Sequence, residues 1–439
     1  MTDNVAEKIL ELARKRFDTA EVFEEPGESL SVSFDDNRLK DIETKQFHGV
    51  GLRVIQKGRV GFAATTDLTD PERLVQMAGD SARYGDEARF DLPGQPGELE
   101  VPETYDEDVP DVSAQNMVEM GRAGLEMSRE RNDEFLYSCG IGRSTHRQRL
   151  LNSAGLDHSS RSTGMSYHVG VQVVKESGSM LHVYDWDRSG HPLTDVREKT
   201  ALVLDKTDLA LNEVRTERQK MPVVFTPFSL NTLLGPLNIA LNGKHVHRGS
   251  SVLAERKDVK VFDERFTVQE DPTVPFASGS CALDDEGTPT RKRHLFENGV
   301  LRSFVADRQT AGLLGWEPTG NGFRSFSSQP SPSTTNTIVA AGEQSYEEIV
   351  SGLDRGLIVE QTLGGHTNNA LAGEFSVNVS LGFLVENGEI VGRVKDAMIA
   401  GNIYELLSDN LEAISSDRRW RGSSLVPSIM VGGITLAVE

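Results

Sequence analysis

The residues best suited to chemistry by type and spacing lie in the second half of the chain. His245 and His247 stand two positions apart, so on a β-strand both imidazoles would point to the same face and could share a metal ion. No third ligand follows nearby in the sequence. We therefore favour a loop or strand end that carries two solvated histidines over a metal site.

Three consecutive carboxylates, Asp284, Asp285 and Glu286, form a second candidate. Carboxylates can hold a hard cation or take part in acid–base catalysis. Consecutive residues, however, point to alternate sides of an extended chain and rarely converge on one point. The segment DDEGTP instead predicts a turn between two strands.

Other familiar catalytic patterns are absent from the sequence. It contains neither HExxH nor HExxxH, no GxSxG nucleophile elbow and no Walker A lysine loop. The Gly- and Asn-rich segments GGHTNNALAGE and WEPTGNGF lack the strand–GxGxxG–helix context of a dinucleotide site. Cys139 and Cys281 have no recognisable histidine partner in the local sequence, so neither is expected to be a nucleophile. Residue chemistry alone therefore indicates no catalytic site.

The composition excludes several classes of protein. The 439 residues include 46 Lys and Arg against 67 Asp and Glu, which gives a formal charge of −21 and disfavours binding to nucleic acid or to an anionic membrane. Two cysteines cannot form a disulfide framework. The first residues lack the apolar region of a signal peptide, and the longest apolar stretches are too short to span a bilayer. We therefore expect a soluble, cytoplasmic protein.

The first half of the chain predicts helices separated by extended strands. Apolar residues at helical spacing predict a helix from Val5 to Phe17, and Asp70-Pro71 is typical of a helix start. The strands between them contain a tight hairpin at Lys57-Gly58. Residues 91–112 are rich in Pro and acidic residues and predict an exposed connector. Further helices are expected over 112–131 and 195–214, with strands and a turn at 152–155 between them.

We place the domain boundary between residues 217 and 218, which gives domains of 1–217 and 218–439. In the second domain, Thr226-Pro227 predicts the start of a helix. Gly235-Pro236 lies inside this helix and is expected to kink or break it, because proline removes a backbone hydrogen bond.

Two dipeptides in the second domain indicate antiparallel sheet. Asn298-Gly299 and Asn387-Gly388 are flanked by apolar runs and predict type I′ hairpins. The expected fold class is α+β. The N-terminal domain combines helices with a mixed sheet, and the C-terminal domain is largely antiparallel β with a central helix.

Several blocks of sequence, in the same order, resemble the TldD/PmbA family, whose members are also called modulators of DNA gyrase. In the first half these blocks are GVGLRVIQKGRVGFAATTDLTDPERL and LLNSAGL. In the second half they include GSCALDDEGTPTRKRHLFENGVLRSFVADRQTAGLLGWEPTGNGFR, NNALAGEFSVNVSLGFLVENGEIVGRVKDAMIAGN and LVPSIMVGGITL. The resemblance spans nearly the whole chain.

The family contains two kinds of subunit. TldD-type chains bind a metal through HExxxH on the helix of the C-terminal domain and a cysteine near the C-terminus, and TldE (PmbA)-type chains lack these residues. The two types pair into a metallopeptidase for unfolded or small peptides. Aligned on the flanking residues, the first His falls on Gly235, the Glu on Pro236 and the second His on Ala240. The cysteine falls near Arg419 or Trp420.

The resemblance therefore implies a non-catalytic TldE-type subunit with no metal ligands of its own. It predicts a heterodimer with a TldD-type partner, in which zinc is expected, and no nucleic acid or membrane as a partner. Candidates for a peptide-binding groove, chosen for expected closeness to the motif helix, are His245, His247, Asp284, Gly365 and His366. Two alternatives stay open. One is an autonomous hydrolase with a site outside the family pattern, and the other is a homodimeric peptide-binding or regulatory protein.

Overall fold

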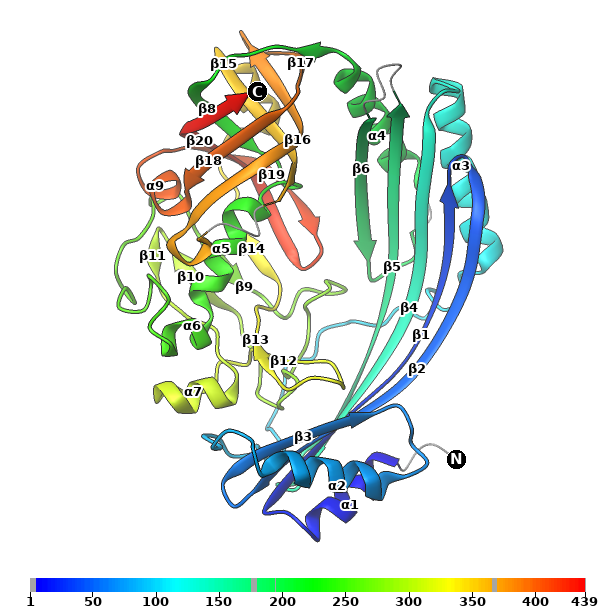
Figure 1. Ribbon diagram of the computed structural model, residues 1–439, viewed down its shortest axis with the longest axis vertical. Helices are drawn as coiled ribbons and strands as arrows, with labels where there is room; N and C mark the ends of the chain where they lie inside the picture. Colours follow the sequence, from blue (N-terminus) through cyan, green and yellow to red (C-terminus); the bar gives the residue numbers. More distant parts are fainter. Residues whose placement is uncertain (1–4, 175–179, 194, 365–368, 439) are drawn as a thin grey trace.

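The computed structural model describes residues 5–174, 180–193, 195–364 and 369–438. These residues form two large β-sheets, one in each half of the chain, with helices packed around them (Figure 1). The expected α+β class is confirmed. Within the described stretches, no helix has both the length and the apolar composition needed to cross a membrane.

The N-terminal half is built on a six-stranded sheet. All neighbouring strands are antiparallel, where the sequence led us to expect a mixed sheet. The segment before the expected turn at 152–155 forms one continuous strand, because its whole length pairs with the neighbouring long strands. In order across the sheet, the strands are β3 (Arg59–Thr65), β2 (Arg38–Gln56), β1 (Thr19–Asp35), β4 (Leu136–Asn152), β5 (Asp157–Val174) and β6 (Met180–Ser189).

The two faces of this sheet differ in composition because side chains alternate along each strand. Val32, Ile141 and Tyr167 stand in one cross-strand row and are buried. Four helices cover this face, namely α1 (Val5–Arg14), α2 (Pro71–Ala82), α3 (Ala114–Arg131) and α4 (Arg197–Leu211). The opposite face is dominated by small residues and is called here the open face. Its central positions include Ser29, Ser31, Ser33, Ser138, Gly140, Gly142, Ser144, Gly164, Ser166 and Gly170.

Local sequence accounts for the helix ends in this half. Asp70 accepts a hydrogen bond from the Arg73 amide, and a proline follows it at the first position of α2, as expected. Ser113 and Asn116 form a reciprocal capping box at the start of α3. The hairpin at Lys57 has the positive φ angle that a type I′ turn needs.

The C-terminal half contains a twelve-stranded sheet that is largely antiparallel, with three parallel pairs. Its main path runs through β11 (Val300–Leu301), β10 (Arg293–Glu297), β9 (Val268–Glu270), β14 (Thr337–Val339), β20 (Ser424–Val438), β8 (Gln219–Phe225), β15 (Arg355–Leu363), β16 (Glu374–Glu386), β17 (Glu389–Val394) and β7 (Glu213–Val214). Two further strands, β18 (Ala397–Asn402) and β19 (Leu411–Arg421), pair with β20, and β12 (Gly322–Phe323) pairs separately with β13 (Ser331–Pro332).

Short helices surround this sheet. They are α5 (Asn231–Leu241), α6 (Gly243–His247), α7 (Arg308–Leu314), the 3-10 turn Ala370–Ala372, α8 (Tyr346–Ser351) and α9 (Ile403–Ser408). Both Asn-Gly hairpins form where expected, between β10 and β11 and between β16 and β17, and Asn298 and Asn387 have positive φ angles. Of the kink or break expected at Gly235-Pro236, the break is wrong, because α5 continues through Pro236 to Leu241, and the kink stays a prediction. Burial of its apolar residues on both sides of Pro236 holds the helix together.

The two halves share one hydrophobic core. In β8 and β15, alternate residues are buried on opposite sides of the sheet. Because both faces of these strands are buried, their consecutive residues are apolar. On one side, Ile358 packs into a cluster that also contains Leu204 of α4 and Val169 of β5. We call this cluster the shared core. It joins the C-terminal sheet to α4 and to the helix-covered face of the N-terminal sheet.

The connector over residues 91–112 is irregular, as expected, and about half of its residues are exposed, but it also contacts both halves. The Thr104 carbonyl accepts a hydrogen bond from the Thr163 amide of β5. The Glu103 carbonyl accepts one from the Phe276 amide of the C-terminal half. The connector therefore bridges the two halves.

Candidate functional site

The helix α5 carries Gly235, Pro236 and Ala240, the positions at which the resemblance places the family's metal motif. Pro236 and Ala240 are buried in the C-terminal core, and Gly235 has no side chain. Its neighbours are apolar, with Leu233 and Leu237 fully packed. A metal site needs nitrogen, oxygen or sulfur donors at fixed spacing, and this helix presents none at these three positions.

The histidines proposed for the groove do not lie on a strand. His245 and His247 belong to α6, where residues two apart do not share a face. The His245 imidazole lies 3.3 Å from the Ser250 hydroxyl, and its carbonyl accepts hydrogen bonds from the Ser250 and Ser251 amides. His247 is exposed. Within the described residues, no group of three or more His, Cys, Asp and Glu side chains is arranged to hold a metal ion.

The run of carboxylates forms a turn, as expected, but the turn is buried against the N-terminal half. Both oxygens of Asp284 accept backbone hydrogen bonds, from Glu286 and Thr288 on one oxygen and from Gly322 on the other. Asp285 accepts a hydrogen bond from the Arg324 amide. These carboxylates therefore organise the local backbone. Gly365 and His366, the other groove candidates, lie outside the described residues.

Glu286 of this turn reaches a buried arginine of the N-terminal sheet. Arg53 Nη1 lies 2.7 Å from Glu286 Oε1, and Arg53 Nη2 lies 2.9 Å from Glu21 Oε1. Arg324, from the segment after β12, approaches the same Glu21 oxygen at 2.8 Å. These four side chains are at most 3% exposed, and we call them the charged cluster.

The charged cluster is covered by aromatic rings. The Arg53 guanidinium lies 4.5 Å from the centre of the Phe90 ring, and that of Arg324 lies 4.6 Å from the Phe23 ring. Burial alone would raise the pKa of Glu21, but the guanidinium groups of Arg324 and Arg53 hold it below its ordinary value. Two arginines and two glutamates thus balance each other at the contact between the halves.

The pKa values of the two neighbouring aspartates shift in the opposite direction from that of Glu21. Burial raises the pKa of Asp285 to about 7. Burial, with the negative charge of Glu286 nearby, also raises the pKa of Asp284, although three backbone amides favour its ionised form. Additional negative charge beside the charged cluster is therefore unfavourable.

A group of rings on the open face was not predicted from the sequence. The Tyr184 ring of β6 stacks on His182 at 5.2 Å between centroids, and His168 of β5 lies 5.9 Å away. Phe228, three residues before α5, meets Tyr184 edge-on at 5.3 Å. With Trp186, these residues form what we call the ring cluster. The alternation of His182, Tyr184 and Trp186 with Leu181, Val183 and Asp185 is the sequence signal that identifies one ring-bearing face of a strand.

Arg421, at the end of β19, ties the C-terminal half to β6. Its guanidinium lies 4.3 Å from the Trp186 ring centre and 4.4 Å from that of Phe228. It donates hydrogen bonds to Asp185 at 2.6 Å and to the Trp186 carbonyl at 3.0 Å. The hairpin of β19 and β20 thereby extends toward β6, the strand of the N-terminal sheet that lies nearest to the C-terminal half (Figure 1). Arg419 and Trp420, where the family's cysteine would fall, belong to this hairpin.

Burial also sets the ionisation of the ring cluster. Although His168 and His182 each keep an exposed surface, burial of the imidazoles lowers the pKa of both, and the nearby His182 lowers the pKa of His168 further. Both rings are therefore neutral at neutral pH. Arg421 is paired with Asp185, so the ring cluster has no net charge.

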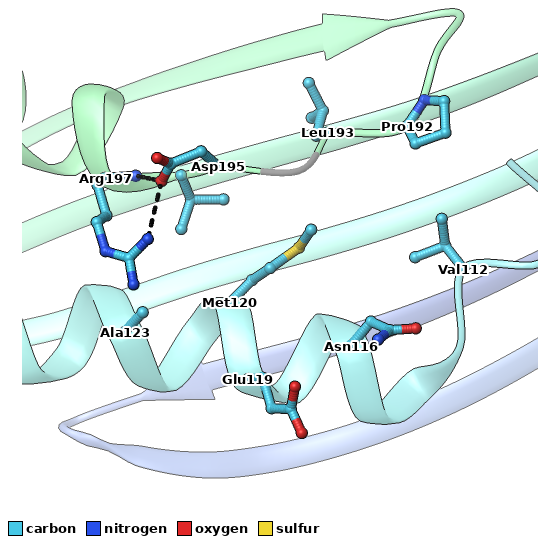
Figure 2. A pocket seen from close by; sticks show the side chains of 10 residues that line it. Val112, Asn116, Glu119, Met120, Ala123, Pro192, Leu193, Asp195 and Arg197 are labelled. Carbon is cyan, nitrogen blue, oxygen red and sulfur yellow. Dashed lines mark hydrogen bonds and ion pairs between the residues drawn. The ribbon is translucent and has the colours of Figure 1, made fainter. Parts of the chain in front are cut away.

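Two cavities lie in the N-terminal half, and among the residues that the structure describes those lining them all belong to that half. The first, of about 360 Å³, has Met120 of α3 on one side and Pro192 and Leu193 on the other (Figure 2). At its edge, Asp195 accepts a hydrogen bond from the Arg197 amide at 2.9 Å, so these polar groups satisfy each other. The second, of about 710 Å³, lies beside α2 and the β2–β3 hairpin.

Zinc does not fit the residues that this chain offers at the family position. Gly235, Pro236 and Ala240 supply no donor, and neither Arg419 nor Trp420 replaces a thiolate. The cysteines are elsewhere and unpaired, and burial raises the pKa of Cys139 to about 11. At these positions α5 therefore offers no ligand for a metal ion.

Known proteins match this chain over nearly its whole length. Residues 218–438 match the PmbA/TldA metallopeptidase C-terminal domain, and residues 20–82 match domain 1 of the same metallopeptidases. An uncharacterized protein of Methanocaldococcus jannaschii is 28% identical over 97% of this chain and 98% of its own length. Metalloprotease PmbA of Escherichia coli O157:H7 is 26% identical over 97% of this chain and 94% of its own.

A solved structure agrees with this result. The crystal structure of TldE from Thermococcus kodakarensis superposes with a TM-score of 0.90 at 26% identity, over 99% of this chain and all of that one. The fold, the order of the elements and the matched domains lead to one conclusion: this chain belongs to the TldD/PmbA family of metallopeptidases.

Proposed function

We propose that this chain is the metal-free, TldE-type subunit of a two-chain peptidase for unfolded or small peptides. The observation that carries the proposal is a complete family scaffold whose motif helix has no donor at Gly235, Pro236 or Ala240. A zinc-binding TldD-type subunit would supply the metal centre. This chain would form one wall of the peptide chamber and order its partner.

The arrangement of the open face supports a role in holding an extended peptide. Its Ser and Gly residues lie between two places where the C-terminal half contacts this face, the charged cluster at one end and Arg421 at the other. Small side chains let a second polypeptide approach the sheet closely. A peptide there would be recognised mainly through its backbone, which suits a sequence-tolerant peptidase.

We also infer that the chain consists of domains 1–217 and 218–439. The six-stranded sheet ends at Ser189, and the C-terminal family match begins at residue 218. The short strand β7, at Glu213–Val214, already belongs to the second sheet, so the link between the domains is packed rather than free. Two unpaired cysteines agree with a reducing, cytoplasmic location.

The test is to produce the full chain alone and together with the TldD-type chain of the same genome. We expect a stable complex that contains zinc and cleaves an unfolded peptide in a chelator-sensitive way, and we expect no cleavage by the lone chain. A partner variant with glutamine in place of its HExxxH glutamate should form the complex without activity.

A matched variant of this chain is Pro236→Ala. Because position 236 supplies no ligand here, the complex should cleave at the wild-type rate within about twofold. Chelator-sensitive cleavage by the lone chain, abolished by changes at His245 or His247, would contradict the proposal and favour the autonomous hydrolase. A homodimer that never binds the partner would favour the regulatory protein.

A further inference from the structure

We propose that the ring cluster binds an uncharged aromatic side chain of an extended peptide lying on the open face. This inference rests on the proposed function for its biological context, but it concerns binding by this chain alone. It assigns the ligand chemistry to His168, His182 and Tyr184, none of which belongs to the family's metal motif.

The first argument is that rings are exposed where the sheet otherwise carries small side chains. His168 and His182 are exposed and Tyr184 is half-buried, and the neighbouring Gly140, Gly142, Gly164 and Gly170 add no side chain. A Cβ atom at Gly170 would lie 2.7 Å from His182 Nε2, so the glycine leaves the space that this imidazole occupies. The rings therefore stand beside a surface that is lined by small side chains.

The second argument is that some rings of the cluster pack against the C-terminal half, whereas others keep a surface that can contact a ligand. Arg421 lies against Trp186 and Phe228, and its guanidinium is held by Asp185. These contacts fasten the C-terminal half to β6. The imidazoles of His168 and His182 contact only Tyr184 among the ring contacts of the described residues, so their outer surfaces are free for a further ring.

The third argument is charge. The chain has a formal charge of −21, yet the ring cluster is neutral because both imidazoles are uncharged and Arg421 is paired. A neutral aromatic surface favours a neutral aromatic ligand through offset or edge-on ring contacts. An acidic side chain placed on Tyr184 would lose hydration against the rings, and Arg188, a cation on the same face of β6, stands four positions further along the strand and lies near Gly164.

The geometry near α5 agrees with this ligand. Phe228 precedes α5 by three residues, and Tyr184 meets it edge-on at 5.3 Å. A peptide that places an aromatic side chain on Tyr184 therefore passes the start of the helix that carries the family motif. The ring cluster would fix the position of the peptide relative to the metal centre of the partner.

The test uses the full chain without a partner and three fluorescently labelled decapeptides that differ only in the central residue, which is Phe, Ala or Glu. Fluorescence anisotropy gives the dissociation constants. We expect the Phe peptide to bind about 3- to 10-fold more tightly than the Ala peptide, the range typical of one aromatic contact. The Glu peptide should bind no better than the Ala peptide.

The double variant His168→Ser, His182→Ser should remove the preference for Phe while keeping the serine-rich character of the face. His146→Ser is the matched control, because His146 lies on the same face but contacts Phe47 at 5.9 Å instead of Tyr184. Tyr184→Leu is a second test that preserves apolar volume. Circular dichroism and thermal melting check that each variant folds.

Equal affinity for the three peptides, or the same loss in His146→Ser as in the double variant, would overturn the inference. If the two-chain complex forms and cleaves while the lone chain does not discriminate, the ring cluster has no such role and the proposed function stands. If the lone chain prefers the Phe peptide but never pairs with a TldD-type chain, the inference stands and the proposed function fails.

Discussion

The shared core and the charged cluster join the same two halves of the molecule by different physical means. In the shared core, Ile358, Leu204 and Val169 remove apolar surface from water, and any neighbour of similar shape is acceptable. In the charged cluster, Arg53 must meet Glu21 and Glu286 with correct geometry, because each charge loses its hydration. The first contact supplies affinity between the halves, and the second fixes their relative position.

The two contacts also differ in their hydrogen bonding, because the charged cluster contains buried polar atoms and the shared core is apolar. Arg324 Nε and Nη1 and Glu21 Oε2 are buried without a hydrogen-bond partner among the described residues. A buried group of this kind costs free energy that the ion pairs only partly offset. The charged cluster is therefore a sensitive contact in which a single missing partner has a large effect.

The largest expected effect comes from Arg53→Met. The substitution keeps the length of the side chain but leaves Glu21 and Glu286 buried without this cation, and we expect a loss of about 3–5 kcal/mol in the free energy of unfolding. Urea denaturation followed by circular dichroism measures it. Arg302→Met, which removes an exposed ion-pairing residue, should cause no measurable change.

Rescue sharpens this prediction. Adding Glu286→Gln to Arg53→Met should restore part of the lost stability, because Glu286 then no longer stays behind as a buried charge, while Glu21 keeps its ion pair with Arg324. A double variant less stable than Arg53→Met would show that Glu286 is held by contacts other than the arginine.

In the shared core, Ile358→Ala should cost about 2–5 kcal/mol, because it leaves a cavity at a position that is 0% exposed. No second substitution at a charged residue should rescue it, and a further truncation such as Leu204→Ala should add to the loss. Full additivity of the two truncations would indicate that they do not share one cavity. The same urea experiment provides the measurement.

The third prediction concerns pH. In the folded chain the pKa of Asp285 is raised to about 7, so the folded state favours the protonated acid. Its contribution is fully present below the ordinary pKa of about 4 and is lost as the pH rises to about 7. Between pH 5 and 7, Asp285→Asn should flatten the decline of stability with pH by up to about 1.4 kcal/mol per pH unit. An unchanged slope would show that Asp285 is ionised throughout.

The smallest effect is expected at Gln361, where β15 meets the edge of β6. Gln361 donates to the Tyr184 carbonyl at 2.7 Å, and its Oε1 is buried without a hydrogen-bond partner in the described part of the chain. Gln361→Leu removes one hydrogen bond and one unsatisfied acceptor together, so stability should change by less than about 1 kcal/mol. A loss as large as that of Ile358→Ala would make this contact a main link between the halves.

Local features of the fold could be predicted because short segments decide them. Asp70-Pro71 starts a helix because a carboxylate can cap the first amides and proline needs no amide bond there. Asn298-Gly299 forms a hairpin because both residues tolerate positive φ. The possible break at Pro236 does not occur for the opposite reason, since the packing of α5 outweighs one missing hydrogen bond.

The candidate site was harder to predict, because its members come together only on folding. The sequence pointed to His245 and His247, which lie apart on a short helix, and it missed His168, His182 and Tyr184. The alternation of residues within β6 predicts that its rings lie on one face of the strand. It does not predict which face of the sheet is left uncovered by helices. That outcome depends on where four helices pack on the other side.

The sequence by itself determined the family, the α+β class and the loss of donors at Gly235, Pro236 and Ala240, since these are matters of residue identity and order. Only the tertiary structure decided that Asp284 and Glu286 are buried at the contact between the halves, with Glu286 paired to an arginine 233 residues earlier in the chain. It also decided that the neutral ring cluster lies beside the motif helix. Contacts of such separation depend on how two sheets pack, and no local pattern of residues specifies that packing.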